Sequence, residues 1–269
     1  MTIIIPAYKE TAEHLDRILT SFESQTFVPN YNVECIFIVD GIRDTYDYLN
    51  GKLQTCKRFT YKLHFNEENL GIGATRDKGI NLAAGEYITF CDADDALAND
   101  KVIKSMSKYK RSGQDWVIGT SLEERPPNGV VKQSNPLKFS AWGRLFKRDF
   151  LIKHEINTGG LRHNEDNVLC FLLNLFCEKP MVDDDEWYVY KHNNVDSITR
   201  RQEKNQSGFL KDRLVVIEYF YRIIVGLLSK YPEKEQRIRR LVPCFTKPFV
   251  GYVEGVLNNV NHGENLCLF

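Results

Sequence analysis

The sequence predicts an α/β fold, with a mostly parallel central sheet flanked by helices and a helical extension at the carboxyl end. Three observations lead to this prediction. Apolar runs of strand length alternate with helical patterns through the first third of the chain. The fourth of these runs ends in three carboxylates, at Asp92, Asp94 and Asp95. After residue 206 only helical periodicity remains.

The composition is typical of a folded protein without overall charge. Of the 269 residues 42% are apolar, and 36 basic residues balance 36 acidic ones. A full core can therefore form, and broad attraction to nucleic acid or an anionic membrane is not indicated. Seven irregularly spaced Cys favour buried, reduced thiols over disulfides or a zinc site. Without a leader pattern or an apolar run of spanning length, we expect a cytoplasmic protein with no membrane span.

Four parallel strands are predicted in the first third of the chain. Each is a short apolar or β-branched run bounded by turn formers, which is the pattern of a strand buried on both faces. A helix is expected between each pair of strands, and right-handed crossovers would then place all four in one sheet. The runs are Thr2–Ile5, Val33–Val39, Tyr61–Phe65 and Glu86–Phe90.

Two connecting helices have clear limits. From Glu13 to Phe22, apolar residues recur on one helical face. Asn69–Gly73 leads into another helix, which we expect Gly85 to close as a carboxyl-terminal cap. Further on, we expect helices at Lys101–Arg111 and Val168–Cys177, strands at Asp115–Ser121, Leu145–Lys147 and Glu186–Tyr190, and a loop or hairpin at Pro126–Gly129.

The carboxyl-terminal segment is predicted to be a helical hairpin. Phe209–Lys230 carries apolar residues at helical spacing, and Pro232 begins a second such stretch that reaches Val250. We expect the apolar stripes to pack on the rest of the chain or to pair in a homodimer, in preference to a role at a membrane surface.

The carboxylates after the fourth run are the strongest chemical signal. Burial ends where charge begins, so Asp92, Asp94 and Asp95 should lie at the carboxyl end of the strand, where ligands bind in open α/β sheets. Crowded carboxylates repel one another unless a cation joins them, and oxygen ligands at i and i+2 suit Mg²⁺ or Mn²⁺. The alternative is a polar turn in which Asp95 caps the next helix.

Two other strand ends should lie on the same rim of the sheet. The first strand ends in Pro6-Ala7-Tyr8-Lys9-Glu10, and the second ends in Asp40-Gly41. In a doubly wound sheet these ends can converge with the acidic turn on one nucleotide.

Six segments form a set that resembles a known family. They are Ile3–Glu10, Asn69–Asp77 followed by Ala84–Ile88, Phe90–Asp95, Trp142–Lys147, Glu165-Asp166, and Tyr188–Lys191 with Ser197–Thr199. Together, over roughly residues 1–200, they resemble the family-2 glycosyltransferases, which implies the A-type, Rossmann-like nucleotide-sugar fold. Three places depart from that pattern: Val39 replaces an Asp before Asp40, Ile42-Arg43 replaces Ser-Thr, and Asp77 replaces an Asn.

The resemblance implies inverting transfer of a sugar from a nucleoside-diphosphate donor, most often a UDP-sugar, to a hydroxyl of a glycan or other acceptor. Asp92 and Asp94 would hold Mn²⁺ or Mg²⁺, which neutralises the departing diphosphate. His192 is a candidate third ligand, against an ordinary surface or core position. Asp166 would be the base that takes the acceptor proton, with Glu165 as second candidate.

The resemblance also assigns binding residues and a domain division. Trp142 and Asp95 are the candidate acceptor contacts, although Trp142 could instead anchor the core. We expect a catalytic domain at 1–205, with its nucleotide-sugar half at 1–95 and its acceptor half at 96–205, and an extension at 206–269. The candidate donor contacts are Pro6, Ala7, Tyr8, Glu10, Asp40, Arg76, Asp92, Ala93 and Asp94. For Asp40 the alternative is a turn former, for Arg76 a structural ion pair, and for Asp166 a helix cap.

Three alternative functions stay open. A nucleotide-sugar-binding protein without turnover is disfavoured by the intact carboxylates. A nucleotidyltransferase would need a phosphate loop richer in Gly, Lys and Arg than Pro6-Ala7-Tyr8. A phage-type enzyme that modifies a hydroxymethylated DNA base could use the basic residues of Lys101–Arg111, Arg200-Arg201 and the 237–240 region. Solvated helix faces are the favoured explanation of those basic residues.

Overall fold

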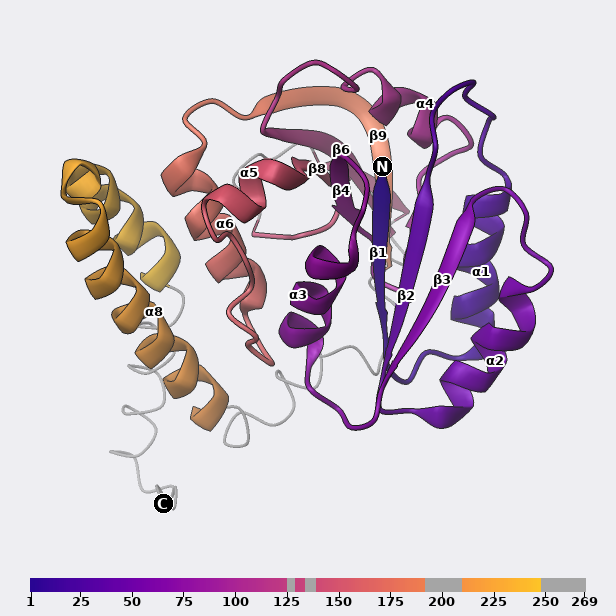
Figure 1. Cartoon of the computed structure of the whole chain (residues 1–269), viewed down its shortest axis with the longest axis horizontal. Helices are drawn as coiled ribbons and strands as arrows, with labels where there is room; N and C mark the ends of the chain where they lie inside the picture. Colours follow the sequence, from indigo (N-terminus) through magenta and orange to yellow (C-terminus); the bar gives the residue numbers. More distant parts are fainter. Residues whose placement is uncertain (125–128, 134–138, 192–209, 248–269) are drawn as a thin grey trace. The chain divides into compact units, whose positions relative to one another are not determined.

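The computed structural model describes residues 1–124, 129–133, 139–191 and 210–247 of the chain (Figure 1). The chain divides into two compact units, Met1–Asn194 and Val195–Phe269. The boundary that we expected after residue 205 lies outside the described residues, and so does the candidate metal ligand His192.

The four predicted parallel strands form one half of the sheet in the first unit. Their spatial order is β3-β2-β1-β4, and each neighbouring pair is parallel. Figure 1 shows β1, β2 and β3 side by side. The strands are β1 (Thr2–Ala7), β2 (Glu34–Asp40), β3 (Thr60–Asn66) and β4 (Tyr87–Phe90). The prediction of a parallel sheet is therefore confirmed for this part of the chain.

Helices cover both faces of these strands. Ile3 and Ile5 of β1 belong to the core that α1 (Ala12–Glu23) completes, whereas Ile4 contacts Gly79 of α3 (Ile72–Leu82) from the other face. The third connecting helix, α2 (Arg43–Leu53), packs against β2 and β3. The buried residues of α1 are Leu15, Ile18, Leu19 and Phe22, the positions that helical periodicity selects.

The other half of the sheet is mixed. Strand β8 (Arg144–Lys147) runs antiparallel to β4, and β6 (Trp116–Glu124) runs antiparallel to β8. The longest strand, β9 (Met181–Lys191), is parallel to β6 and pairs with the short β5 (Ala96–Leu97). An outer strand, β7 (Val130–Gln133), pairs with β6. Since β9 begins before the alternating stretch Glu186–Tyr190, its first residues carry little sequence signal.

The helices of this half differ from expectation at their ends. The helix expected at Lys101–Arg111 is α4 (Val102–Ser107), and that expected at Val168–Cys177 is α6 (Glu165–Phe176). The sequence does not predict α5 (Arg148–Lys153), because six residues are too few to show a helical period. The earlier start of α6 places Glu165 and Asp166 in its first turn.

Gly85 is not the helix cap that we predicted. Helix α3 ends at Leu82 with Ala83 as its C-cap residue, so Gly85 lies beyond the cap. A Cβ at Gly85 would lie 2.5 Å from the backbone carbon of Met1 and from the backbone nitrogen of Thr2. This glycine therefore serves close backbone approach to the start of β1.

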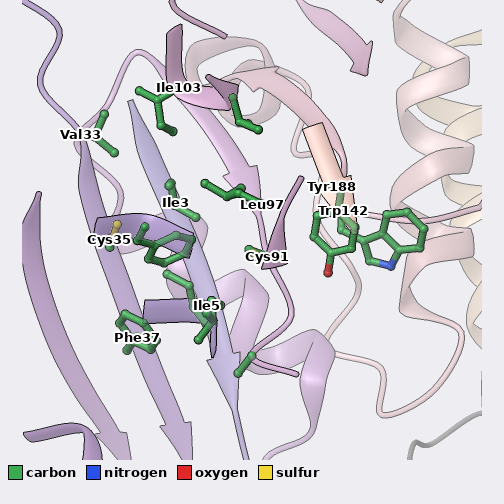
Figure 2. Close-up of a cluster of buried hydrophobic side chains, with 14 of the residues drawn as sticks. Ile3, Ile5, Val33, Cys35, Phe37, Cys91, Leu97, Ile103, Trp142 and Tyr188 are labelled. Carbon is green, nitrogen blue, oxygen red and sulfur yellow. The ribbon is translucent and has the colours of Figure 1, made fainter. Parts of the chain in front are cut away.

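The hydrophobic core extends from β1 and β2 to Trp142 and to Tyr188 of β9. Figure 2 shows Ile3, Ile5 and Phe37 in one part of it, and Trp142 with Tyr188 at the far side. In the described part of the chain the cysteines are unpaired, and four of them, at positions 35, 91, 170 and 177, are buried, as their spacing suggested.

The second unit contains the predicted helices. Its described part consists of α8 (Leu210–Lys230), a short 3₁₀ turn at Pro232–Lys234 and a helix over 235–247. Val216 and Phe220 of α8, and Ile238 and Phe245 of the following helix, are buried. Among the residues that the structure describes, no helix has the length and apolar character that a bilayer crossing requires.

The contact between α3 and β1 gives a test of the fold. A Cβ at Gly79 would lie 2.3 Å from Cγ2 of the buried Ile4. We expect Gly79→Ala to lower the free energy of unfolding by about 1–3 kcal/mol through overpacking, as measured by urea denaturation. The matched control is Gly51→Ala in α2, where nothing lies within 4 Å of the new Cβ. That change should stabilise by about 0.5–1 kcal/mol, and a similar effect at both sites would contradict this packing.

Candidate active site

The three strand ends meet on one rim, as predicted. Strands β1, β2 and β4 are parallel and lie together, so the loop after Ala7, the residue Asp40 and the turn after Phe90 share one edge of the sheet. The turn is closed by a hydrogen bond from Asp95 N–H to the Asp92 carbonyl, at 3.0 Å. Within it Asp92 and Asp94 are partly exposed, whereas Ala93 and Asp95 are buried. The Asp94 carbonyl accepts a hydrogen bond from the Arg17 guanidinium.

Arg76 joins the acidic turn to the predicted base. Its Nη2 lies 2.6 Å from Oδ1 of Asp92, and its Nη1 lies 2.6 Å from Oε1 of Glu165 and 2.5 Å from Oδ1 of Asp166. The guanidinium is 1% exposed and also lies over the ring of Phe90. We call these four charged residues the Arg76 cluster. Residues predicted as donor contact, metal ligand and base are thus brought into direct contact.

Burial dominates the protonation of this cluster. It raises the pKa of Glu165 to about 8, helped by the charge of Asp166 and opposed by Arg76. Burial also raises the pKa of Asp166, although Arg76 and the backbone N–H of Ala141 favour the charged form. The carboxylates hold the pKa of Arg76 well above its ordinary value despite burial. Arg76 therefore remains a fixed cation beside Glu165 and Asp166 as these two acids titrate.

Glu10 brings a further carboxyl group to the rim. Its Oε2 accepts a hydrogen bond from the Tyr8 N–H at 2.5 Å, which folds the loop after β1 back on itself. Burial raises the pKa of Glu10 to about 7, and the charges of Asp94 and Asp92 act in the same direction. Negative charge is therefore concentrated where the loop after β1 approaches the acidic turn.

Asp40 anchors a loop in this structure. Its carboxylate accepts hydrogen bonds from the N–H groups of Leu70 and Gly71, at 2.9 and 2.8 Å, and from Nδ2 of Asn66 at 2.8 Å. The side chain is buried, and Gly71 has a φ of +94° that a larger residue would rarely adopt. These bonds hold the start of α3 against β2, and the predicted contact of Asp40 with the nucleotide stays a prediction.

Asp77 is a residue whose role the sequence did not reveal. It accepts hydrogen bonds from Thr158 N–H and Gly160 N–H, at 2.8 and 3.0 Å. This carboxylate fixes the loop that leads to Glu165 and Asp166 at the start of α6. Its replacement of the expected Asn was the one available signal, because only a carboxylate can accept both N–H groups with separate oxygens.

The candidate acceptor residues are buried and partnered. Trp142 is 7% exposed and stacks on Tyr188 with ring centroids 4.6 Å apart and on Tyr190 at 5.3 Å. Asp95 is 1% exposed, and its two oxygens accept from the Tyr188 hydroxyl at 2.6 Å and from Lys191 N–H at 2.9 Å. Figure 2 shows the rings of Tyr188 and Trp142 together. The roles of Trp142 and Asp95 toward an acceptor stay predictions.

A known protein family shares the sequence pattern that builds this site. The model described as glycosyl transferase family 2 matches residues 2–165, which include the acidic turn and the first residue of α6. The chain belongs to glycosyl transferase family 2. Its enzyme class is therefore that of a glycosyltransferase, as the sequence motifs indicated.

A relative of this chain is much longer than the stretch that matches. Glycosyltransferase GlyA of Streptococcus pneumoniae is 27% identical over 222 residues, which cover 71% of this chain and 30% of GlyA. The chain thus spans less than a third of that relative's length.

Two solved structures share its fold. TarS of S. aureus in complex with UDP-GlcNAc has a TM-score of 0.67 at 17% identity, covering 91% of this chain and 72% of TarS. The mannosyltransferase PcManGT from Pyrobaculum calidifontis, in complex with GDP-Man and Mn²⁺, has a TM-score of 0.59 at 13% identity. It covers 81% of this chain and 64% of PcManGT. The A-type glycosyltransferase fold is therefore confirmed.

The donor set of the acidic turn fits a divalent cation that a substrate helps to hold. No group of three or more His, Cys, Asp or Glu among the described residues could hold a metal ion by itself. Asp92 bonds Arg76 through Oδ1 and is 21% exposed, and Asp94 lies two residues further in the same turn. One or two carboxylates completed by phosphate oxygens are the usual protein contribution to a Mg²⁺ site. The residues of this family-2 glycosyltransferase fit that arrangement.

The raised pKa of Glu165 predicts a pH dependence of stability. The folded chain binds a proton on Glu165 more tightly than the unfolded chain does. Protonation of Glu165 therefore contributes its full stabilisation at pH values below the unfolded pKa of about 4.3, and this contribution is lost as the pH rises through about 8. We expect the free energy of unfolding to fall by roughly 1–3 kcal/mol across this range from Glu165. Glu165→Gln, which still accepts from Arg76 but does not titrate, should flatten the slope in urea denaturation from pH 5 to 9.

The control for this experiment is Glu67→Gln on the surface, which should keep the wild-type slope. Glu10 titrates near pH 7 and leaves a smaller slope in every variant. An unchanged slope in Glu165→Gln would mean that Glu165 stays ionised beside Arg76 in the folded protein.

Proposed function

We propose that this glycosyltransferase moves a sugar from a nucleoside-diphosphate donor to a hydroxyl acceptor with inversion, using a divalent cation. The observation that carries the proposal is the Arg76 cluster, because it joins Asp92 of the donor-side turn to Asp166 of α6 through one guanidinium. Donor activation and acceptor deprotonation then take place on two sides of a single rigid group.

The donor side is assigned to the acidic turn and the loop after β1. Asp92 and Asp94 would hold Mn²⁺ or Mg²⁺, and the bound cation would neutralise the charge that builds on the departing diphosphate. A nucleotide-sugar donor is supported by the UDP-GlcNAc complex of TarS and the GDP-Man complex of PcManGT. A metal is supported by the Mn²⁺ in the latter. We place a UDP-sugar first among the donors.

The acceptor side is assigned to α6. Asp166 takes the proton of the acceptor hydroxyl while the hydroxyl oxygen forms a bond to the anomeric carbon of the sugar. The bond between that carbon and the diphosphate breaks on the opposite face. Partial exposure of Asp166, 21% of its side chain, allows contact with a substrate, whereas Glu165 is 10% exposed. Asp166 is therefore the preferred base.

The acceptor is proposed to be a glycan or another hydroxyl compound. The hydroxymethylated DNA base stays an alternative, and binding to DNA that is lost as salt rises would support it. A cytoplasmic location and pairing through the carboxyl-terminal helices also stay predictions.

The donor and the metal can be tested together by thermal unfolding with a panel of nucleotide sugars, with and without Mn²⁺. A UDP-sugar should stabilise the wild type only when Mn²⁺ is present, by about 2.7 kcal/mol at one hundred times Kd. Asp94→Ala should abolish this effect, whereas Asp184→Ala, at an exposed carboxylate of β9, should keep it. Equal stabilisation of the Asp94→Ala variant and the wild type would overturn the assignment of the metal site.

The base can be tested by separating transfer from binding. Asp166→Asn should lower kcat for sugar transfer about 10²–10⁴-fold, because an amide is too weak a base to take the proton of the acceptor hydroxyl. The Asn oxygen can still accept from Arg76, so stabilisation by donor and Mn²⁺ should persist. Glu165→Gln should retain more transfer activity than Asp166→Asn, and the reverse order would make Glu165 the base.

A further inference from the structure

Tyr188 connects the acidic turn to the far half of the sheet. We infer that Tyr188 and Asp95 are positioning residues that hold the metal-binding turn in place by bonding it to β9, and that Asp95 does not contact the acceptor. This inference rests on the proposed function, because it assigns Asp92 a role toward donor and metal.

A chain of hydrogen bonds carries the inference. The Tyr188 hydroxyl accepts from the Asp92 N–H at 3.1 Å and donates to Oδ2 of Asp95 at 2.6 Å. Oδ1 of Asp95 accepts from the Lys191 N–H at 2.9 Å. Both ends of the turn, at Asp92 and Asp95, are therefore bonded to residues of one strand, β9.

Burial decides how these two residues can act. Tyr188 and Asp95 are each 1% exposed, and both oxygens of Asp95 are already bonded within the chain. At 1% exposure a substrate could reach Asp95 only if the residues packed around its side chain moved. Any effect of either residue on sugar transfer must therefore pass through the turn that they hold.

The backbone on either side of the turn is held by the same part of the molecule. Before the turn, Phe90 forms a parallel bridge with Trp142, whose ring stacks on Tyr188 with an interplanar angle of 8°. After the turn, β5 pairs with β9, with Leu97 opposite Tyr188. The backbone before the turn and the backbone after it thus both pair with residues that lie next to Tyr188 or with Tyr188 itself.

Asp92 is consequently fixed from two directions. Arg76 bonds its carboxylate from α3, and the Tyr188 hydroxyl bonds its backbone N–H from β9. Removal of the hydroxyl leaves the Asp92 N–H without this partner and Oδ2 of Asp95 without its Tyr188 donor, while the bonds from Lys191 to Asp95 and from Arg76 to Asp92 remain. The turn can then shift its carboxylates relative to a cation, and the affinity for that cation should fall.

The experiment compares Tyr188→Phe with the matched variant Tyr190→Phe, which removes a hydroxyl from the next ring of the same stack. The readout is the Mn²⁺ concentration that gives half of the thermal stabilisation by a saturating UDP-sugar. We expect Tyr188→Phe to raise this concentration about tenfold, in the range found for residues that orient metal ligands, and Tyr190→Phe to leave it unchanged. Thermal unfolding without ligand measures the purely structural effect of each change.

Asp95→Asn provides a second measurement, since the one amide oxygen cannot take the place of the two carboxylate oxygens that accept from the Tyr188 hydroxyl and from the Lys191 N–H. It should raise the Mn²⁺ requirement in the same way and leave the acceptor KM within about twofold of wild type. A rise in acceptor KM without any change in the Mn²⁺ requirement would overturn the inference and restore Asp95 as an acceptor contact.

The failure of this inference differs from a failure of the proposed function. If Tyr188→Phe is destabilised but keeps the wild-type Mn²⁺ requirement, the inference alone is overturned. If the wild type shows no stabilisation that depends on metal and nucleotide sugar, the proposed function is overturned, and the inference with it. Should Asp95→Asn fail to fold, Tyr188→Phe decides the matter, because it keeps the buried ring and its stack on Trp142.

Discussion

A buried guanidinium among three carboxylates is the interaction on which the active site depends. Arg76 is almost fully enclosed, and it is bonded to acids from two separate elements, the turn after β4 and the first turn of α6. Loss of one partner from a buried ion pair is strongly destabilising, by about 3–5 kcal/mol, because an uncompensated charge stays behind. The turn after β4 and the first turn of α6 are therefore held together at Arg76.

Helix α3 is the element that holds these groups in fixed positions. The start of α3 is held by the Asp40 carboxylate, and its Arg76 bonds the three carboxylates of the Arg76 cluster. Its Asp77 accepts hydrogen bonds from the loop that leads into α6. Gly79 then lets the helix lie directly on β1 at Ile4. On the opposite side of the acidic turn, Tyr188 and Asp95 fasten it to β9. Asp92 and Asp166, which are proposed to act on substrate, are thus each held by bonds to other parts of the chain.

The sequence predicted much of this arrangement, and its failures have physical causes. The strand ends and the acidic turn were placed on the correct rim, because apolar runs and their polar ends are local properties. The start of α6 and the short α5 were missed, because a few residues cannot display a helical period. The helical pattern predicts Gly85 to be a cap, whereas the structure shows that it permits a close approach to Met1 and to Thr2, which lies 83 residues away in the chain.

The sequence by itself determined the order of the first four strands and their connecting helices, the family, and which carboxylates stand at the rim, since these depend on the spacing of apolar and charged residues within short segments. Only the tertiary structure decided which side chains those carboxylates bond. The bonds from Arg76 to Glu165 and from Tyr188 to Asp95 join residues 89 and 93 positions apart. No local pattern encodes such a pair, because it exists only once the sheet and its covering helices have packed.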